Sequence, residues 1–268
     1  MFQKQTKNVQ HLRKVIKQLN QDINESIQKS NTLKENILVR LLALTYSAWS
    51  EAQFIQIIYT PNAFTTNEIN SMVKIKGIFD RWKKLINFSF EKIETYNFIE
   101  KEKSIEILKN NGETNKIALF CERFNEENQL IQEKKNELIL LLQKYIEEPS
   151  KIRNKIAHGQ WIYPLDDSEI KDNIPNASLK EDSHLKIKLD DLNPISIMRE
   201  FEVHTTLGKI IRKLIESQSK GFTQKYNPYM DELKKYLERT ESYTMSIKRE
   251  RLQKKPSYIT CNVCKEKI

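Results

Sequence analysis

The chain has 268 residues, 45 basic and 36 acidic side chains, a formal net charge of +9, and only 5 glycines and 7 prolines. This length is enough to bury a core in one large or two small domains, which excludes a mini-protein, and the composition predicts long helices and an all-α fold. Three cysteines, a polar N-terminus without a secretory leader, and an apolar stretch at 37–59 that polar residues interrupt predict a cytoplasmic protein without a membrane span.

Helices are predicted from the start of the chain. Residues 9–29 have helical composition, and Asn31 and Thr32 then offer an N-cap for a second helix that ends near Pro61. This second helix is apolar nearly all round, which is typical of a helix at the centre of a bundle.

The middle of the chain also has a helical pattern. A third tract covers 66–110, with Gly77 as a kink, and Asn110-Asn111-Gly112 stops it. A fourth tract covers 114–147, and Pro149 is expected to end it. Ser150 can cap the next helix and Gly159 can end it, so a helix of about two and a half turns is predicted between them.

After this short helix the pattern changes. Residues 160–183 carry many turn signals and predict an irregular excursion. The alternation over 184–189 favours a short strand, and Pro194 starts another helix. Beyond Gly221 apolar residues are sparse, so 226–255 is read as an exposed helix followed by a tail.

The C-terminal region is strongly basic. Residues 209–268 contain 15 Lys and Arg against 7 Asp and Glu, a net charge of +8. Such a field favours an anionic partner, above all nucleic acid, although a solvated lysine-rich surface is an equally good explanation of the charge alone. Within it, Lys248, Arg249 and Arg251 are candidate RNA-binding residues, with a solvated helix as the alternative.

The short helix carries the residues that suggest chemistry. Arg153 and His158 are five positions apart in the stretch 151–159. Histidine exchanges a proton near neutral pH, and arginine holds a phosphate by a permanent forked charge, so together they provide part of what metal-free RNA cleavage needs. The alternative is a histidine at a helix C-terminus beside a surface arginine.

This pattern resembles the HEPN superfamily, helical-bundle proteins of which many are metal-independent endoribonucleases marked by Arg-x4-His. Arg153, Asn154 and His158 match that motif, and residues 44–51 are similar to an aromatic, acid-bearing early helix of several HEPN groups. The resemblance covers about 30–217. The HEPN-like core is therefore expected at 30–217, and the composition of the flanking residues predicts an N-terminal helix at 1–29 and a basic extension at 218–268 with a terminal Cys-x-x-Cys.

The chemistry of RNA cleavage predicts the assembly. The 2′-hydroxyl is the nucleophile, so the reaction needs a base, an acid and cations for the phosphorane charge. One chain supplies one such histidine, and a homodimer with facing motif helices would supply two. We expect a 2′,3′-cyclic phosphate and a 5′-hydroxyl as products, no cofactor or metal, and no cleavage of DNA.

Residues around the motif have more than one interpretation. Glu51 is the one charge between Arg40 and Glu68. It could face solvent on a polar stripe with Ser47 and Gln53, or meet a cation, for which Arg153 is the candidate. Asn154 could orient a phosphate oxygen or the partner histidine, or be an ordinary polar helix residue.

Other signals are weaker. Lys151, Lys155 and Trp161 are candidate RNA contacts beside the motif. Trp161 and Tyr163 could stack on a flipped base or cover the bundle. Cys261 and Cys264 have zinc-ligand spacing, and two copies could complete a four-cysteine site, although reduced thiols on a tail are the simpler state.

The sequence therefore predicts an all-α, HEPN-like bundle with a short extended insertion after the motif helix and a basic C-terminal helix and tail. The expected function is a dimeric endoribonuclease for single-stranded or loop RNA, including tRNA. The resemblance implies a toxin or antiphage defence effector with an antitoxin or regulatory partner. The rivals are an RNA- or nucleotide-binding module without catalysis, and a structural subunit of a larger complex.

Overall fold

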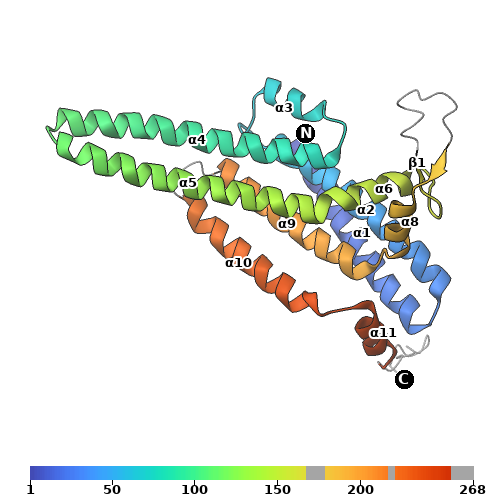
Figure 1. The fold of residues 1–268 in the computed structure, drawn as a ribbon. Helices are drawn as coiled ribbons and strands as arrows, with labels where there is room; N and C mark the ends of the chain where they lie inside the picture. Colours follow the sequence, from blue (N-terminus) through green and yellow to red (C-terminus); the bar gives the residue numbers. More distant parts are fainter. Residues whose placement is uncertain (167–178, 217–220, 255–268) are drawn as a thin grey trace, which may run out of the picture. The chain divides into compact units, whose positions relative to one another are not determined.

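The protein is all-α, apart from one ladder of two short strands, over the residues that the computed structural model describes, 1–166, 179–216 and 221–254. Its contacts divide the chain into two compact units. Figure 1 labels the helices and strands along the chain. The first unit is Met1–Val9, Ser50–Lys151 and Glu200–Lys235, and the second is Gln10–Trp49, Ile152–Arg199 and the chain from Tyr236 onward. Several helices contribute one end to each unit.

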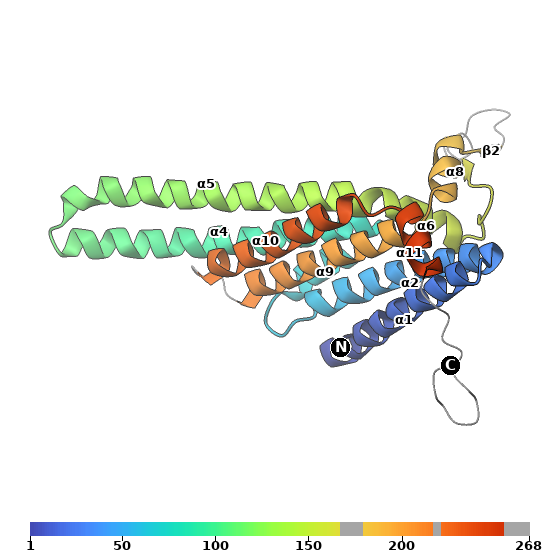
Figure 2. The ribbon, with the colours of Figure 1, turned by 90° about the horizontal axis from the view of Figure 1, so that it is seen from below.

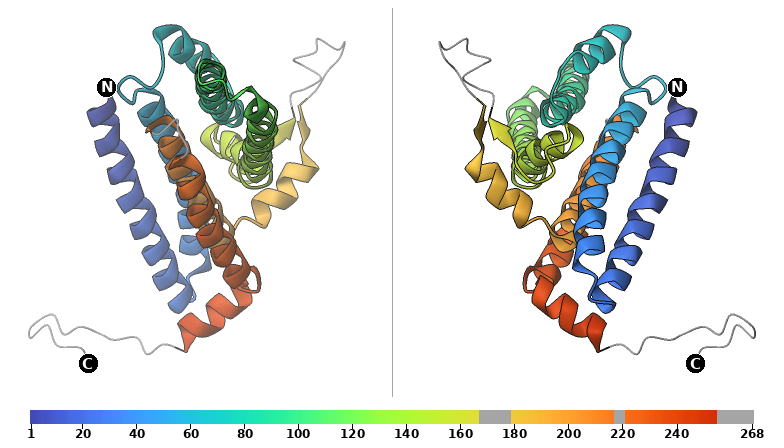
Figure 3. Two further views of the ribbon diagram at one scale, coloured as in Figure 1. Left: turned by 90° about the vertical axis from the view of Figure 1, so that its left-hand side faces the viewer. Right: turned by 90° about the vertical axis from the view of Figure 1, so that its right-hand side faces the viewer.

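Helices α1 (Phe2–Gln28) and α2 (Thr32–Ile58) form an antiparallel hairpin (Figure 3). Ser30 takes a positive φ of 51° in the turn, and Asn31 Oδ1 accepts the Lys34 backbone N–H at 3.0 Å, which confirms the predicted cap. Helix α1 begins earlier than predicted and buries isoleucines at helical spacing. Helix α2 has buried residues on several sides, among them Leu42, Trp49, Phe54 and Ile57.

The third predicted tract is two helices, α3 (Thr66–Val73) and α4 (Ile78–Asn110). Gly77 is therefore the N-cap residue of α4 and not a kink within one helix. Helix α4 ends at the predicted stop, where Gly112 has a φ of 72°, a value that glycine adopts without strain.

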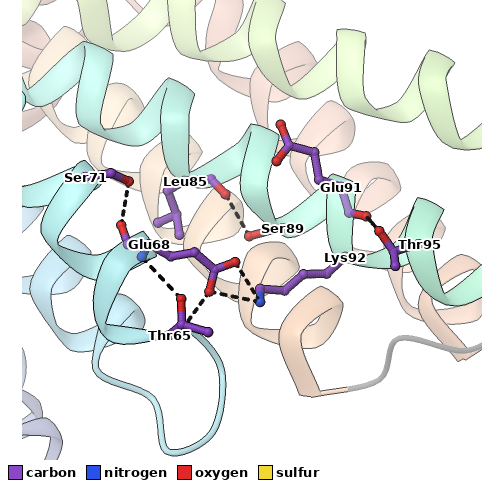
Figure 4. Close-up of polar contacts among 8 residues, drawn as sticks. All are labelled: Thr65, Glu68, Ser71, Leu85, Ser89, Glu91, Lys92 and Thr95. Atoms are coloured by element: carbon purple, nitrogen blue, oxygen red, sulfur yellow. Dashed lines mark hydrogen bonds and ion pairs between the residues drawn. The ribbon is translucent and has the colours of Figure 1, made fainter.

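A capping box starts α3 and ties it to α4 within the first unit (Figure 4). The Thr65 N–H donates to Glu68 Oε2 at 2.6 Å, and the Glu68 N–H donates to Thr65 Oγ1 at 3.3 Å. Lys92 on α4 places its Nζ 3.0 Å from Glu68 Oε1. Burial raises the pKa of Glu68, but the Thr65 hydrogen bonds and Lys92 outweigh it, so that the pKa lies below its usual value.

Helices α4 and α5 (Ile117–Leu142) form a long antiparallel hairpin, joined through a 3₁₀ turn at Thr114–Lys116 (Figure 2). Helix α5 continues through a π-helical segment, Gln143–Glu147, into α6 (Glu148–Ala157). The prediction that Pro149 ends the helix and Ser150 caps the next is wrong, since the Ser150 hydroxyl donates to the Glu147 carbonyl at 2.6 Å. The π segment shifts the hydrogen-bond register where proline lacks an N–H, so the helical path continues.

Helix α9 (Pro194–Glu216) begins at the predicted proline and is largely buried from Phe201 to Leu214. In the first unit Gly208 of α9 meets α2: a Cβ at position 208 would lie 2.3 Å from Gln53 Nε2. The absence of a side chain therefore permits this close approach. Ser47 and Gln53 are both buried, so the solvent-facing polar stripe considered for α2 does not exist.

In the second unit the excursion after α6 contains strands β1 (Leu165–Asp166) and β2 (Lys180–Glu181), paired antiparallel. The strand predicted at 184–189 is wrong, because these residues belong to helix α8 (Ser183–Asp190). Asp182 caps α8 by accepting the Leu185 N–H at 2.9 Å. Leu185 and Leu189 are both buried one turn apart, so a helix fits the apolar pattern.

The C-terminal region forms α10 (Gly221–Glu241) and α11 (Met245–Gln253). The prediction of one exposed helix over 226–255 is wrong, because Tyr226, Met230 and Leu233 of α10 and Lys248 of α11 are buried. In the part of the chain that is described, no helix is long and apolar enough to cross a bilayer.

Candidate functional site

The motif lies at the C-terminal end of α6, where a glycine with a positive φ ends the helix. His158 is the C-cap residue, and its N–H donates to the Asn154 carbonyl at 3.1 Å. Gly159 has a φ of 79°, its N–H donates to Ile156 O at 3.1 Å, and the Gln160 N–H donates to Lys155 O at 2.9 Å. These two bonds form a Schellman motif, so the predicted end of the helix is confirmed.

The side chains of α6 divide into two faces. Lys151, Asn154 and His158 are exposed and lie within about 60° of one another around the axis, at 3.6 residues per turn. We call these three residues the outer face of α6. Ile152 and Ile156 are buried on the other side, so the helix is anchored by its inner face.

Arg153 belongs to the inner face. A separation of five residues turns the helix by about 140°, so Arg153 and His158 leave one α6 on different sides. Arg153 is half-buried and its Nε is buried, whereas His158 is exposed. The cation on the outer face is Lys151, whose Nζ lies 3.5 Å from Glu147 Oε1.

The chain that leaves α6 is fastened back to it. Leu165 donates its N–H to Gln160 Oε1 at 2.8 Å, and Lys155 Nζ donates to the Leu165 carbonyl. Lys155, a predicted RNA contact, therefore has an internal role. Trp161 is half-buried, and its carbonyl accepts a hydrogen bond from Arg40 Nε of α2 at 3.0 Å.

Glu51 lies on α2 in the first unit, and its side chain is half-buried. Arg153 belongs to the second unit. The suggested ion pair between them remains a prediction.

Two of the three basic residues predicted on α11 contact other helices of the second unit. Arg249 forms a forked ion pair with Glu35 of α2, with N–O distances of 2.8 and 2.6 Å. Lys248 is 7% exposed, its Nζ lies 3.5 Å from Asn20 Oδ1, and burial lowers its pKa. Arg251 is exposed, with its guanidinium 5.3 Å from the ring centroid of Tyr243. Among the three, Arg251 is therefore the one best placed for a phosphate.

The first unit contains a buried polar cluster that the sequence did not predict. Trp82 Nε1–H donates to Ser50 Oγ at 3.2 Å, and Ser50 Oγ lies 3.4 Å from His204 Nε2. His204 is fully buried and packs edge-on against Trp82, with ring centroids 4.4 Å apart. Burial lowers the pKa of His204 to about 3, so the ring is neutral and Nε2 can accept a hydrogen bond from the Ser50 hydroxyl.

The only sequence signal for this cluster is the apolar spacing around His204, which indicates a buried helix face. His11 and His184 are exposed. Cys261 and Cys264 lie outside the described residues. In the described part of the chain, no group of three or more His, Cys, Asp and Glu side chains is arranged to hold a metal ion.

No protein-family model, curated protein or solved structure matches this chain.

Proposed function

We propose that the protein is a metal-independent endoribonuclease that acts as a homodimer on single-stranded or loop RNA. The observation that carries the proposal is the exposed imidazole of His158 at the C-terminal end of α6, on one face with Asn154 and Lys151. An acid–base group that is exposed to solvent and fixed by a rigid backbone turn can approach a polymeric substrate.

In this mechanism the His158 of one copy takes the proton of the ribose 2′-hydroxyl. The 2′-oxygen attacks the adjacent phosphorus, and the bond to the 5′-oxygen breaks. The His158 of the second copy gives a proton to that leaving oxygen. The products are a 2′,3′-cyclic phosphate and a 5′-hydroxyl, and the atoms and charges balance without a further reactant.

The helix geometry supports the need for two copies. Arg153 and His158 diverge by about 140° on one α6, and one chain supplies one motif histidine, so the proposal places the phosphate between two copies of α6. A twofold axis on the side of α6 that carries Asn154, between Arg153 and His158, would bring both residues of each copy toward one phosphate. In the proposal Arg153 supplies charge for the phosphorane from the partner copy, and Asn154 orients a phosphate oxygen.

The basic residues support an RNA substrate in a general way. Lys151 and Arg251 are exposed in the described chain, and the net charge of +9 favours a polyanion. A role as a toxin or antiphage effector, regulated by an antitoxin or another protein, follows from the HEPN resemblance and belongs to the proposal.

The experiment is incubation of the purified full chain with total RNA in the presence of EDTA. We expect cleavage by the wild type, none by His158→Ala, and wild-type cleavage by His184→Ala, which removes an exposed histidine of α8 and is the matched control. Light scattering should give the mass of a dimer. RNA binding without cleavage would support the binding module, and a stable monomer would exclude the composite site.

A further inference from the structure

The segment after α6 presents one aromatic ring to solvent. Tyr163 is 61% exposed, whereas Trp161, the aromatic residue that the sequence favoured for RNA, is half-buried and held through its carbonyl by Arg40. The ring is available because the segment is fixed: Gln160 and Lys155 both hold Leu165, two residues after the tyrosine.

Helix α8 completes the surroundings of this ring. The Asp182 N–H donates to the Pro164 carbonyl at 2.8 Å, which ties the start of α8 to the residue after Tyr163. Lys186 of α8 then places its Nζ 5.9 Å from the centroid of the Tyr163 ring. Helix α6, the β1 segment and α8 lie side by side in the second unit (Figures 1 and 2). Asp190 forms an ion pair with Lys186 one turn along α8 and is the acidic group that opposes it.

We propose that Tyr163 is a stacking residue for an unpaired base of RNA, with Lys186 as the contact for an adjoining phosphate. This inference rests on the proposed function and names the recognition element for its substrate. An exposed aromatic ring beside a lysine is the combination that single-stranded nucleic acids use, because every base has a π-face and every nucleotide has a charge.

The position of the ring fits the proposed cleavage site. Tyr163 follows His158 by five residues, and that length of chain spans at most about 18 Å even when extended. A short oligonucleotide can therefore contact both side chains. A base inside a duplex offers no free face, so this contact selects single-stranded or loop RNA.

The test measures binding in the His158→Ala background, so that cleavage does not interfere. Fluorescence anisotropy of short labelled single-stranded RNA is compared with that of a duplex of the same sequence. We expect Tyr163→Ala to weaken single-strand binding about tenfold and Tyr163→Phe to keep it within about twofold, because the ring makes the contact. Lys186→Ala should reduce the salt dependence by about one counterion.

Ile162→Ala is the matched control, because Ile162 is the neighbouring residue and is 59% exposed. It should bind RNA like its parent. The inference is overturned if Tyr163→Ala binds RNA unchanged, if Ile162→Ala is equally weak, or if Tyr163→Ala instead loses the dimer, which would make this surface a protein contact. If binding depends on Tyr163 but the chain with His158 intact does not cleave RNA, the stacking role stands and only the nuclease proposal is overturned. If the chain with His158 intact cleaves RNA but Tyr163→Ala leaves RNA binding unchanged, the nuclease proposal stands and the stacking role is overturned.

Discussion

Arg249 of α11 and Glu35 of α2 form a forked ion pair, although 214 residues separate them in the chain. Glu35 is 4% exposed, so its carboxylate depends on this partner for the hydrogen bonds that water would otherwise supply. The pair therefore fastens α11 to α2 in the second unit, together with the contact between Lys248 and Asn20.

Replacing Arg249 by Met should lower the free energy of unfolding by roughly 2–3 kcal/mol, less than for a fully buried pair because Arg249 is partly exposed. Denaturant unfolding of Arg249→Met and of the Glu35→Leu/Arg249→Met double variant tests this, and the double variant should be more stable than Arg249→Met because the unpaired Glu35 carboxylate is gone. Arg251→Ala is the control and should leave stability unchanged while weakening RNA binding. Equal stability of Arg249→Met and wild type would exclude the fastening role.

The buried His204 predicts a loss of stability in acid. Its pKa is lowered to about 3 by burial, whereas an unfolded chain has the ordinary value near 6.5. Below about pH 6.5 the unfolded state binds a proton that the folded state does not. The free energy of unfolding is therefore unaffected by this group above pH 6.5 and decreases as the pH is lowered from 6.5 to about 3. The slope for this one group is at most about 1.4 kcal/mol per pH unit.

The measurement is the free energy of unfolding between pH 7 and pH 4 for the wild type and for His204→Gln. The variant is expected to be less stable at every pH, because glutamine does not reproduce the packing of the imidazole against Trp82. Its free energy of unfolding should decrease less steeply below pH 6.5. Parallel curves for the two proteins would show that His204 does not titrate on unfolding.

Gly208→Ala should destabilise the first unit although alanine is the better helix former. The added Cβ would lie 2.3 Å from Gln53 Nε2, and Gln53 is buried on α2. We expect a net loss of about 1–3 kcal/mol from this overpacking. Thermal unfolding should also show that Gln53→Ala/Gly208→Ala is more stable than Gly208→Ala alone. A Gly208→Ala protein as stable as wild type would mean that α2 and α9 separate without cost.

The capping box predicts the stability of α3. Thr65→Ala removes the hydroxyl that accepts the Glu68 N–H and should cost about 1 kcal/mol. Thr66→Ala, at the neighbouring exposed position, is the control and should be close to neutral. Because the pKa of Glu68 is lowered in the folded chain, its contribution should be present near neutral pH and decline in acid. Equal losses for the two alanine variants would argue against the box.

Local signals predicted several boundaries correctly. The all-α class, the cap at Asn31 and the turns at Gly112 and Gly159 follow from composition and from backbone preferences that act over a few residues. The segment 184–189 was misread because six alternating residues fit a strand, whereas the cap at Asp182 and the pair Leu185 and Leu189 select a helix.

Burial of charges could not be read from local sequence. Glu51 attracted attention as an isolated acid, yet Glu35 is the buried one, and only the fold brings Arg249 to it. Similarly, Trp161 and Tyr163 are two residues apart and equally aromatic. Trp161 is half-buried and Tyr163 is exposed, and the Trp161 carbonyl accepts a hydrogen bond from Arg40 of α2, which is distant in sequence.

The central claim is that His158 provides the acid–base group of RNA cleavage. The most direct measurement is mapping of the cut ends of RNA from cells that express the wild type, His158→Ala or His184→Ala. We expect new 2′,3′-cyclic phosphate ends with the wild type and His184→Ala, and none with His158→Ala. Ends of the same kind and number with His158→Ala, or no new ends with any of the three proteins, would contradict this claim.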